Sequence, residues 1–223
     1  MIGFGRALVI VLFAGIASSP APAHPDGIAG PMGVASPPAA EPEGGDDSLA
    51  PGAKPEPAPP VQTRQQKLDD LFARLAASKD AAETNGLIAA IDRLQLESGS
   101  NTGDFLMARA IAALGTRNLQ VSRSLLDKIV VLRPDWAEAW NKRATVRYLL
   151  GDERGSMADI ARVLVLEPRH FGALSGMGMI LERGGFNDDA LRAYRRALEI
   201  APQLESLRTA VERLTAAARG QSL

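Results

Sequence analysis

The sequence predicts an all-α protein, a superhelical solenoid of stacked antiparallel helix pairs, and the prediction rests on its prolines. Twelve of the 15 prolines lie between Pro20 and Pro60, whereas the other three are Pro134, Pro168 and Pro202. These three are evenly spaced, with a period of 34 in the sequence numbering. Each follows an apolar stretch that we expect to be helical, and the proline ends this helix because it cannot continue the hydrogen-bond ladder. A fixed period of this length indicates an array of repeated supersecondary units.

Residues 1–23 have the pattern of a secretory signal peptide. One cation, Arg6, precedes an apolar run at 7–16, and Ala21-Pro22-Ala23 forms a small-residue cleavage site. The alternative is an uncleaved membrane anchor, but a helical run of this length spans only about 16 Å of a hydrocarbon core about 30 Å thick. We therefore expect cleavage after Ala23, a periplasmic or secreted protein, and no stable membrane insertion after cleavage.

Residues 24–62 are rich in proline, alanine, glycine and acidic residues. Such a segment has too little apolar surface to offset the entropy lost on ordering. We expect a disordered acidic linker that ends where helical periodicity begins.

The composition excludes several classes of function. The chain has no cysteine, two histidines (His24 and His170) and a formal net charge of −1. These residues are too few for a zinc site or a histidine-based catalytic centre, and the charge does not fit a nucleic-acid-binding face. The sequence predicts a protein that is not an enzyme and has no cofactor or metal.

Two helical segments flank the 34-residue repeats. Residues 63–101 hold a degenerate helical hairpin with an apolar stripe at Leu68, Leu71, Phe72 and Leu75, and it should shield the N-terminal end of the stack. Residues 205–219 predict a helix that caps the other end.

Three repeats lie between these segments, at 103–136, 137–170 and 171–204. The first fits least well, because Gly115 is displaced from the turn position. The interhelix positions hold Trp140, Ala144, Gly151, Ser156, Ile160, Val163 and Pro168 in the second repeat, and Leu174, Gly178, Gly185, Ala190, Tyr194, Ala197 and Pro202 in the third.

This pattern resembles the tetratricopeptide repeat family, in an exported bacterial form. Small residues such as Ala144 and Gly178 allow the paired helices to approach closely. We therefore expect Gly178 to accept alanine but not tryptophan.

The resemblance implies a non-enzymatic interaction module that binds a peptide or protein in a concave groove. Met residues and Ile111 would supply apolar contact, while Asn141, Lys142 and Tyr148 would fix the register of the partner. The family's groove positions correspond to Met107, Ile111, Asn141, Lys142, Thr145, Tyr148, Ser175, Met179 and Arg183. The alternatives are a self-associating subunit, hence a homo-oligomer, or an enzyme-associated subunit.

Two features allow more than one interpretation. Arg143 and Arg147 lie one helical turn apart and can form a fork for an anion, or can pair with acids such as Glu153 or Asp159. His170, at a repeat junction, is expected to be structural because the sequence around it supplies no catalytic partner.

Overall fold

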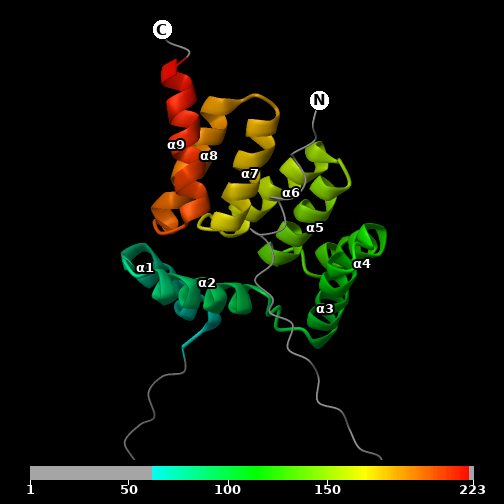
Figure 1. Cartoon of the computed structure of the whole chain (residues 1–223). Coiled ribbons are helices and arrows are strands. Elements are labelled where there is room, and N and C mark those ends of the chain that lie inside the picture. The colour runs from blue at the N-terminus through cyan, green and yellow to red at the C-terminus, as the bar shows by residue number, and fades with distance from the viewer. Residues whose placement is uncertain (1–61, 221–223) are drawn as a thin grey trace, which may run out of the picture. The chain divides into compact units, whose positions relative to one another are not determined.

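The computed structural model describes residues 62–220 (Figure 1). The predicted signal peptide and residues 24–61 of the predicted linker lie outside these residues. In the described part the chain forms nine α-helices: α1 (Arg64–Ala77), α2 (Ala81–Gln95), α3 (Asn101–Gly115), α4 (Leu119–Leu132), α5 (Ala137–Leu149), α6 (Glu153–Leu166), α7 (Phe171–Arg183), α8 (Asn187–Ile200) and α9 (Glu205–Gly220). None of these nine is long and apolar enough to cross a membrane.

From α3 to α8 the helices pack in pairs, and each of these pairs packs on the next. The pairs are α3 with α4, α5 with α6, and α7 with α8, while α4 contacts α5, α6 contacts α7, and α9 covers α8. Each core is shared between neighbours. For example, Trp136 and Ala139 lie in a cluster with Met107 and Leu126 of the preceding helix pair. A pair therefore buries its apolar stripes only with its neighbours present.

A residue with positive φ makes the turn within each repeat. Gly151 and Gly185 have φ values of 85° and 81°, and Arg117, one repeat period before Gly151, has a φ of 60°. The displaced Gly115 lies inside α3 and does not make the turn. The first repeat thus keeps the turn geometry and accepts a non-glycine residue in the left-handed region.

Small residues set the distance between the paired helices. Ser122 and Ser156 occupy the same position of successive repeats, and their hydroxyl groups donate to the carbonyl oxygens of Ala110 and Ala144, each at 2.8 Å. At the same position of the third repeat Ala190 is fully buried. A larger side chain at these sites would separate the two helices.

The structure does not support the expectation that Gly178 accepts alanine. A β-carbon added at Gly178 would lie 2.4 Å from the Tyr194 ring, which is itself buried. We expect Gly178→Ala to lower the free energy of unfolding by about 1–3 kcal/mol through overpacking. Denaturant melts of the two proteins measure the difference.

A second glycine provides a control for this prediction. A β-carbon at Gly86, in the interior of α2, meets no atom within 4 Å. Gly86→Ala should raise stability by about 0.5–1 kcal/mol, because it removes backbone freedom from the unfolded chain. If Gly178→Ala gave the same gain, the close contact with Tyr194 would be refuted.

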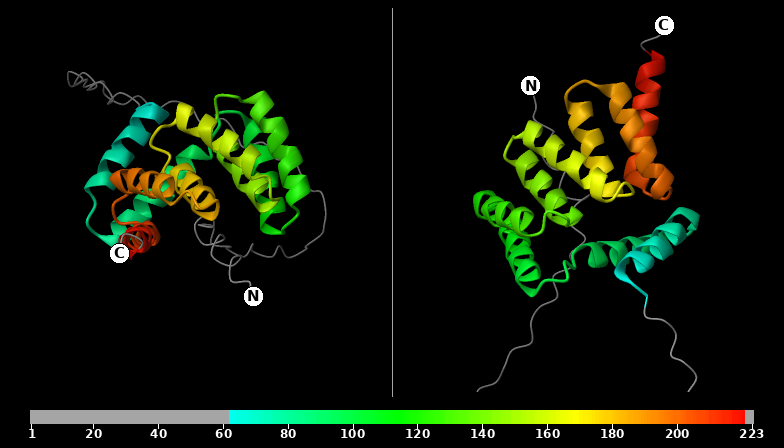
Figure 2. Two further views of the ribbon diagram at one scale, coloured as in Figure 1. Left: turned by 90° about the horizontal axis from the view of Figure 1, so that it is seen from above. Right: turned by 180° about the vertical axis from the view of Figure 1, so that it is seen from behind.

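The hairpin of α1 and α2 does not shield the N-terminal end of the stack, and this expectation is wrong. It lies across the ends of α7 and α8, as Figures 1 and 2 both show, and α1 contacts α8. Its apolar side chains form a cluster with the junction before α9: Leu68, Phe72, Leu75, Leu87, Ile91 and Ala201, with Phe171, Ile200 and Leu204 at the edge. Leu96, at the end of α2, packs against the core around Met107.

Polar contacts also attach this hairpin to the junctions between repeats. The indole N–H of Trp136 donates to the carbonyl oxygen of Gln95 at 2.7 Å. The guanidinium of Arg169 lies 4.5 Å from the ring centre of Phe72 and pairs with Asp69 at 2.8 Å. The hairpin therefore contacts the loops that follow α4 and α6 as well as the end of α8.

Candidate partner-binding groove

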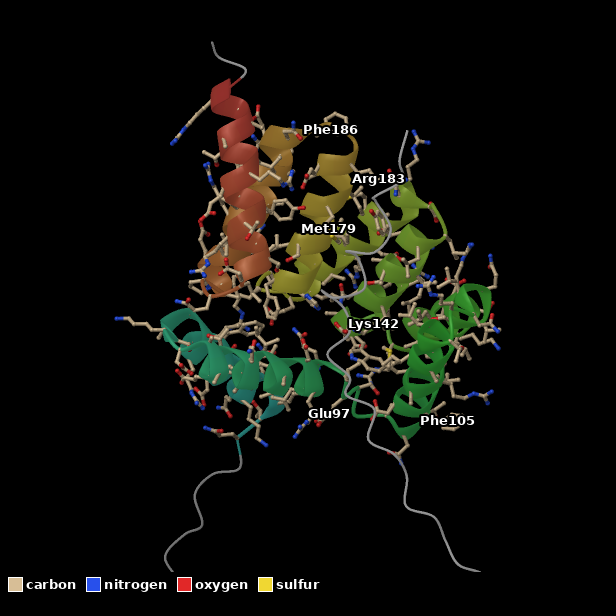
Figure 3. The ribbon with its side chains drawn as sticks, viewed as in Figure 1. Glu97, Phe105, Lys142, Met179, Arg183 and Phe186 are labelled. Atoms are coloured by element: carbon tan, nitrogen blue, oxygen red, sulfur yellow. The ribbon has the colours of Figure 1, made fainter. Side chains whose placement is uncertain are left out.

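The first helix of each repeat carries the predicted groove residues. These helices are α3, α5 and α7, and Figure 3 shows Lys142 on α5 and Met179 and Arg183 on α7. A small pocket, open to solvent, lies between α5 and α7, with α6 behind it. It is lined by Asn141, Ala144, Thr145, Tyr148, Ser156, Ile160, Gly172, Ala173, Gly176, Met179 and Ile180. The structure thus brings together Asn141, Thr145, Tyr148 and Met179 of the predicted set.

The other predicted residues lie elsewhere. Met107 is only 2% exposed and belongs to the core of the first repeat, and Ile111 packs against the same core. Ser175 is buried, and its hydroxyl donates to the carbonyl oxygen of Phe171 at 2.7 Å. Met107 and Ser175 therefore cannot contact a partner without a rearrangement of the helices.

Arg183 borders the pocket on its solvent side. Its guanidinium lies 5.8 Å from the ring centre of Tyr148, and its Nε lies 3.2 Å from an oxygen of Glu153 on α6. The side chain of Arg183 is 62% exposed. Tyr148, Met179 and Arg183 are thus the members of the predicted set that a partner can reach most directly.

A buried carboxylate, Glu138, lies at the N-terminal end of α5. One oxygen is 2.8 Å from Nζ of Lys142, and the other accepts a hydrogen bond from Nδ2 of Asn141 at 3.0 Å. Burial opposes ionisation, but the charge of Lys142 and the hydrogen bonds of His170 and Lys142 outweigh it and lower the pKa of Glu138 to about 2. Burial likewise opposes the charge of Lys142, yet Glu138 raises the pKa of the ammonium above its usual value.

This cluster changes the interpretation of two predicted residues. Asn141 and Lys142 were expected to fix the register of a partner, but their polar groups already bind Glu138. A partner would have to compete with a buried carboxylate for them. The sequence carried a partial signal, because Glu138 lies four residues before Lys142, the spacing of a helical ion pair.

His170 has a structural position that defines its tautomer. It caps α7, where its Nδ1 accepts the backbone N–H of Ala173 at 3.2 Å, so that Nε2 carries the proton. Nε2 donates to Glu138 at 2.9 Å. The histidine therefore links α7 to α5.

Arg143 and Arg147 pair with acids, which was one of the two interpretations. Arg143 forms a two-pronged contact with the buried Asp159, at 2.9 and 2.7 Å, and reaches Asp127 on α4 at 3.0 Å. Arg147 lies 3.1 Å from Asp159. Glu153, the other acid considered as a partner, pairs with Arg183 instead. The two arginines thus stabilise the contacts within the second repeat and with α4.

The described residues contain no cluster of three or more histidine, cysteine or acidic side chains placed to hold a metal ion. The groove is instead an apolar recess bordered by an aromatic ring and a guanidinium.

Comparison with known proteins finds relatives that are named for the tetratricopeptide repeat. The chain is 41% identical over 138 residues to a TPR repeat-containing protein of Rhizobium etli, a match that covers 62% of this chain and 68% of that protein. It is 31% identical over 112 residues to tetratricopeptide repeat protein 36 of Bos taurus, covering 48% of this chain and 57% of that one. No protein-family model matches the chain.

Solved structures share the fold at low sequence identity. The first TPR of Spaghetti (RPAP3), bound to an HSP90 peptide, matches with a TM-score of 0.52 and 16% identity, over 54% of this chain and 95% of that one. The Sgt2 TPR domain of Aspergillus fumigatus matches with a TM-score of 0.51 and 16% identity, over 55% and 83%. These matches confirm the predicted all-α fold of paired helices.

Proposed function

Because the chain belongs to the tetratricopeptide repeat proteins, we propose that it is a non-enzymatic adaptor that holds a segment of a protein partner between α5 and α7. Such repeat proteins are typically non-catalytic binding modules. The solved Spaghetti (RPAP3) domain holds an HSP90 peptide, and this supports the same kind of ligand here without identifying it.

The observation that carries the proposal is the apolar pocket between α5 and α7. The surface of the pocket is mostly apolar, and the thioether of Met179 can adapt to different side chains. The neighbouring hydroxyl of Thr145 is already satisfied, because it donates to the carbonyl oxygen of Asn141 at 3.1 Å. The pocket therefore fits an apolar side chain better than a polar one.

Arg183 defines the second element of recognition. It lies on the solvent side of the pocket, and its ion pair with Glu153 is largely exposed, so a partner carboxylate can replace Glu153 at little cost. We propose that the partner offers an apolar side chain for the pocket and an acidic residue for Arg183.

Site-specific photocrosslinking tests this proposal in the full-length chain. A benzophenone amino acid at Met179 should crosslink one segment of one partner, whereas the same group at Val165 should not. Val165 is 71% exposed on α6 and does not line the pocket. Met179→Glu should then weaken binding of the identified segment by at least about tenfold, or about 1.4 kcal/mol, while Val165→Glu leaves its affinity unchanged.

Two other results would count against the proposal. A partner that binds Met179→Glu with undiminished affinity would exclude the pocket between α5 and α7. A dimer in light scattering that Met179→Glu converts to a monomer would assign this pocket to self-association. Circular dichroism of each variant shows whether its helices are intact.

Export is a separate proposal that rests on the pattern of residues 1–23 alone. Mass spectrometry of the native protein should find a mature N-terminus at His24. Recovery of the chain with Met1 in place would contradict the proposal of a cleaved signal peptide.

A further inference from the structure

The outer face of α3 is apolar and uncovered, although the same face of α5 and α7 is buried. Ala139 on α5 and Ala173 on α7 are buried against the preceding repeat. The residue at the same place in the first repeat is Phe105, which is 60% exposed and lies on the side of α3 away from α5 in Figure 3. We call Phe105, Arg109 and Ala112 the α3 outer face.

The reason for this exposure is the position of the first hairpin. In the second and third repeats α4 and α6 cover these positions. The hairpin of α1 and α2 would have to do so in the first repeat, but it packs at the junction before α9. The α3 outer face is therefore the place where the described array lacks its preceding helix.

The second repeat, in which α4 covers this face of α5, shows what charge a helix packed on α3 should carry. Arg143, on the corresponding face of α5, reaches Asp127 on α4 at 3.0 Å. Arg109 lies one repeat period before Arg143, and its guanidinium is placed over Phe105, 5.8 Å from the ring centre. Within residues 62–220 Arg109 forms no ion pair. A carboxylate placed like that of Asp127 would complete the arrangement.

We propose that the α3 outer face docks an amphipathic helix of another protein, packed on α3 as α4 is packed on α5. The helix would present a carboxylate to Arg109, and small side chains opposite Phe105, because Phe105 is larger than the alanine at the same position of α5. This surface is distinct from the pocket between α5 and α7.

The chain's own first hairpin does not fit this place. The residues one repeat period before Leu126 and Asp127 of α4 are Asp92 and Arg93. If α2 packed on α3 as α4 packs on α5, Asp92 would take the place of Leu126, which is only 1% exposed. Arg93 would then lie beside Arg109. Both changes are unfavourable.

A second copy of the chain also fits poorly. A two-fold axis through the α3 outer face would bring Arg109 near the same residue of the second copy. In a head-to-tail arrangement the face would meet α9, whose exposed side chains include Arg208, Glu212 and Arg213. The first arrangement supplies no carboxylate at Arg109, and the second offers mainly charged side chains in place of the apolar stripe that α4 supplies to α5.

Peptide titration with the full-length chain tests the proposal. The probe is an acetylated, fluorescein-labelled peptide of residues 118–134, the α4 segment, in its native form and with Val130→Ala to make room for Phe105. At least one form should bind, with an anisotropy change that saturates. Phe105→Glu in the chain should weaken this binding by about tenfold or more, and Arg109→Glu should do the same.

A charge exchange makes the test specific. The probe with Asp127→Arg should fail on the wild-type chain and bind the Arg109→Glu chain. Phe186→Glu is the matched control, since Phe186 is 61% exposed at the turn before α8, and Met179→Glu tests the groove. Neither control should change the affinity for the probe.

Three outcomes would overturn the proposal. The first is that neither form of the probe binds the chain. The second is that the Phe105→Glu and Phe186→Glu chains bind the probe with equal affinity. The third comes from light scattering: a dimer that Phe105→Glu converts to a monomer would show that a second copy occupies the face. Because the groove variant is measured in parallel, failure here leaves the proposed function intact.

Discussion

Asp159→Asn is expected to lower the free energy of unfolding by about 3–5 kcal/mol, because it removes the carboxylate shared by two arginines. Asp159 is 2% exposed, and the side chains of Arg143 and Arg147 are mostly buried around it. Their charges would stay in the interior without a full counter-charge. Urea unfolding followed by circular dichroism measures the loss.

The contact with Asp127 supplies the control. Asp127 binds the same Arg143, but its side chain is 42% exposed, so Asp127→Asn should cost less than about 1 kcal/mol. Adding Arg147→Met to Asp159→Asn should recover part of the loss, since one unpaired charge is removed. Equal effects of Asp159→Asn and Asp127→Asn would show that burial does not strengthen this cluster.

Glu138→Gln is expected to lower the free energy of unfolding by about 3 kcal/mol at pH 7 and by much less at pH 2. The pKa of Glu138 is about 2 in the folded chain, against an ordinary value of 4.5. Between these values the unfolded chain binds the proton more tightly, so stability rises with pH. The contribution of Glu138 is therefore complete above about pH 4.5 and is lost as the pH falls through 2.

The pH profile has to separate Glu138 from a neighbouring acid. Partial desolvation and the charge of Glu138 raise the pKa of Asp92, whose side chain is exposed on α2, so the contribution of Asp92 has the opposite sign. We would therefore measure the effect of Glu138→Gln in an Asp92→Asn background. Glu205→Gln, at an exposed pair with Arg208, serves as the control and should lower the free energy of unfolding at pH 7 much less than Glu138→Gln does. If Glu138→Gln lowered the free energy of unfolding by the same amount from pH 2 to 7, this result would contradict the lowered pKa of Glu138.

The even spacing of Pro134, Pro168 and Pro202 was enough to predict the paired helices, because each proline ends a helix and small residues recur between the prolines. The spacing could not locate the hairpin of α1 and α2. Asp92 and Gln95 occupy the positions that correspond to the buried Leu126 and Ile129, so its apolar stripe faces another direction. A comparison of these positions would have revealed the mismatch, but not the docking site near Ala201.

The groove was predicted less well than the fold. Helical position alone placed Tyr148 and Met179 in the predicted set, and both line the pocket between α5 and α7. It could not show that Met107 is buried or that Asn141 and Lys142 bind Glu138, because burial and pairing depend on the neighbouring helices. Sequence reasoning also proposed Asp159 as a partner of the two arginines, which the structure confirms.

The docking of α1 near Ala201 has a consequence for how the protein unfolds. In an open array of repeats, contacts join near neighbours, and the terminal units fray independently. Here Phe72 contacts Arg169, and Leu68 shares a cluster with Ala201, so residues far apart in the sequence are in contact. These contacts raise the contact order, which slows folding, and they join the last repeat to the first described helix. The described helices should therefore lose their structure in one cooperative transition instead of peeling from the ends.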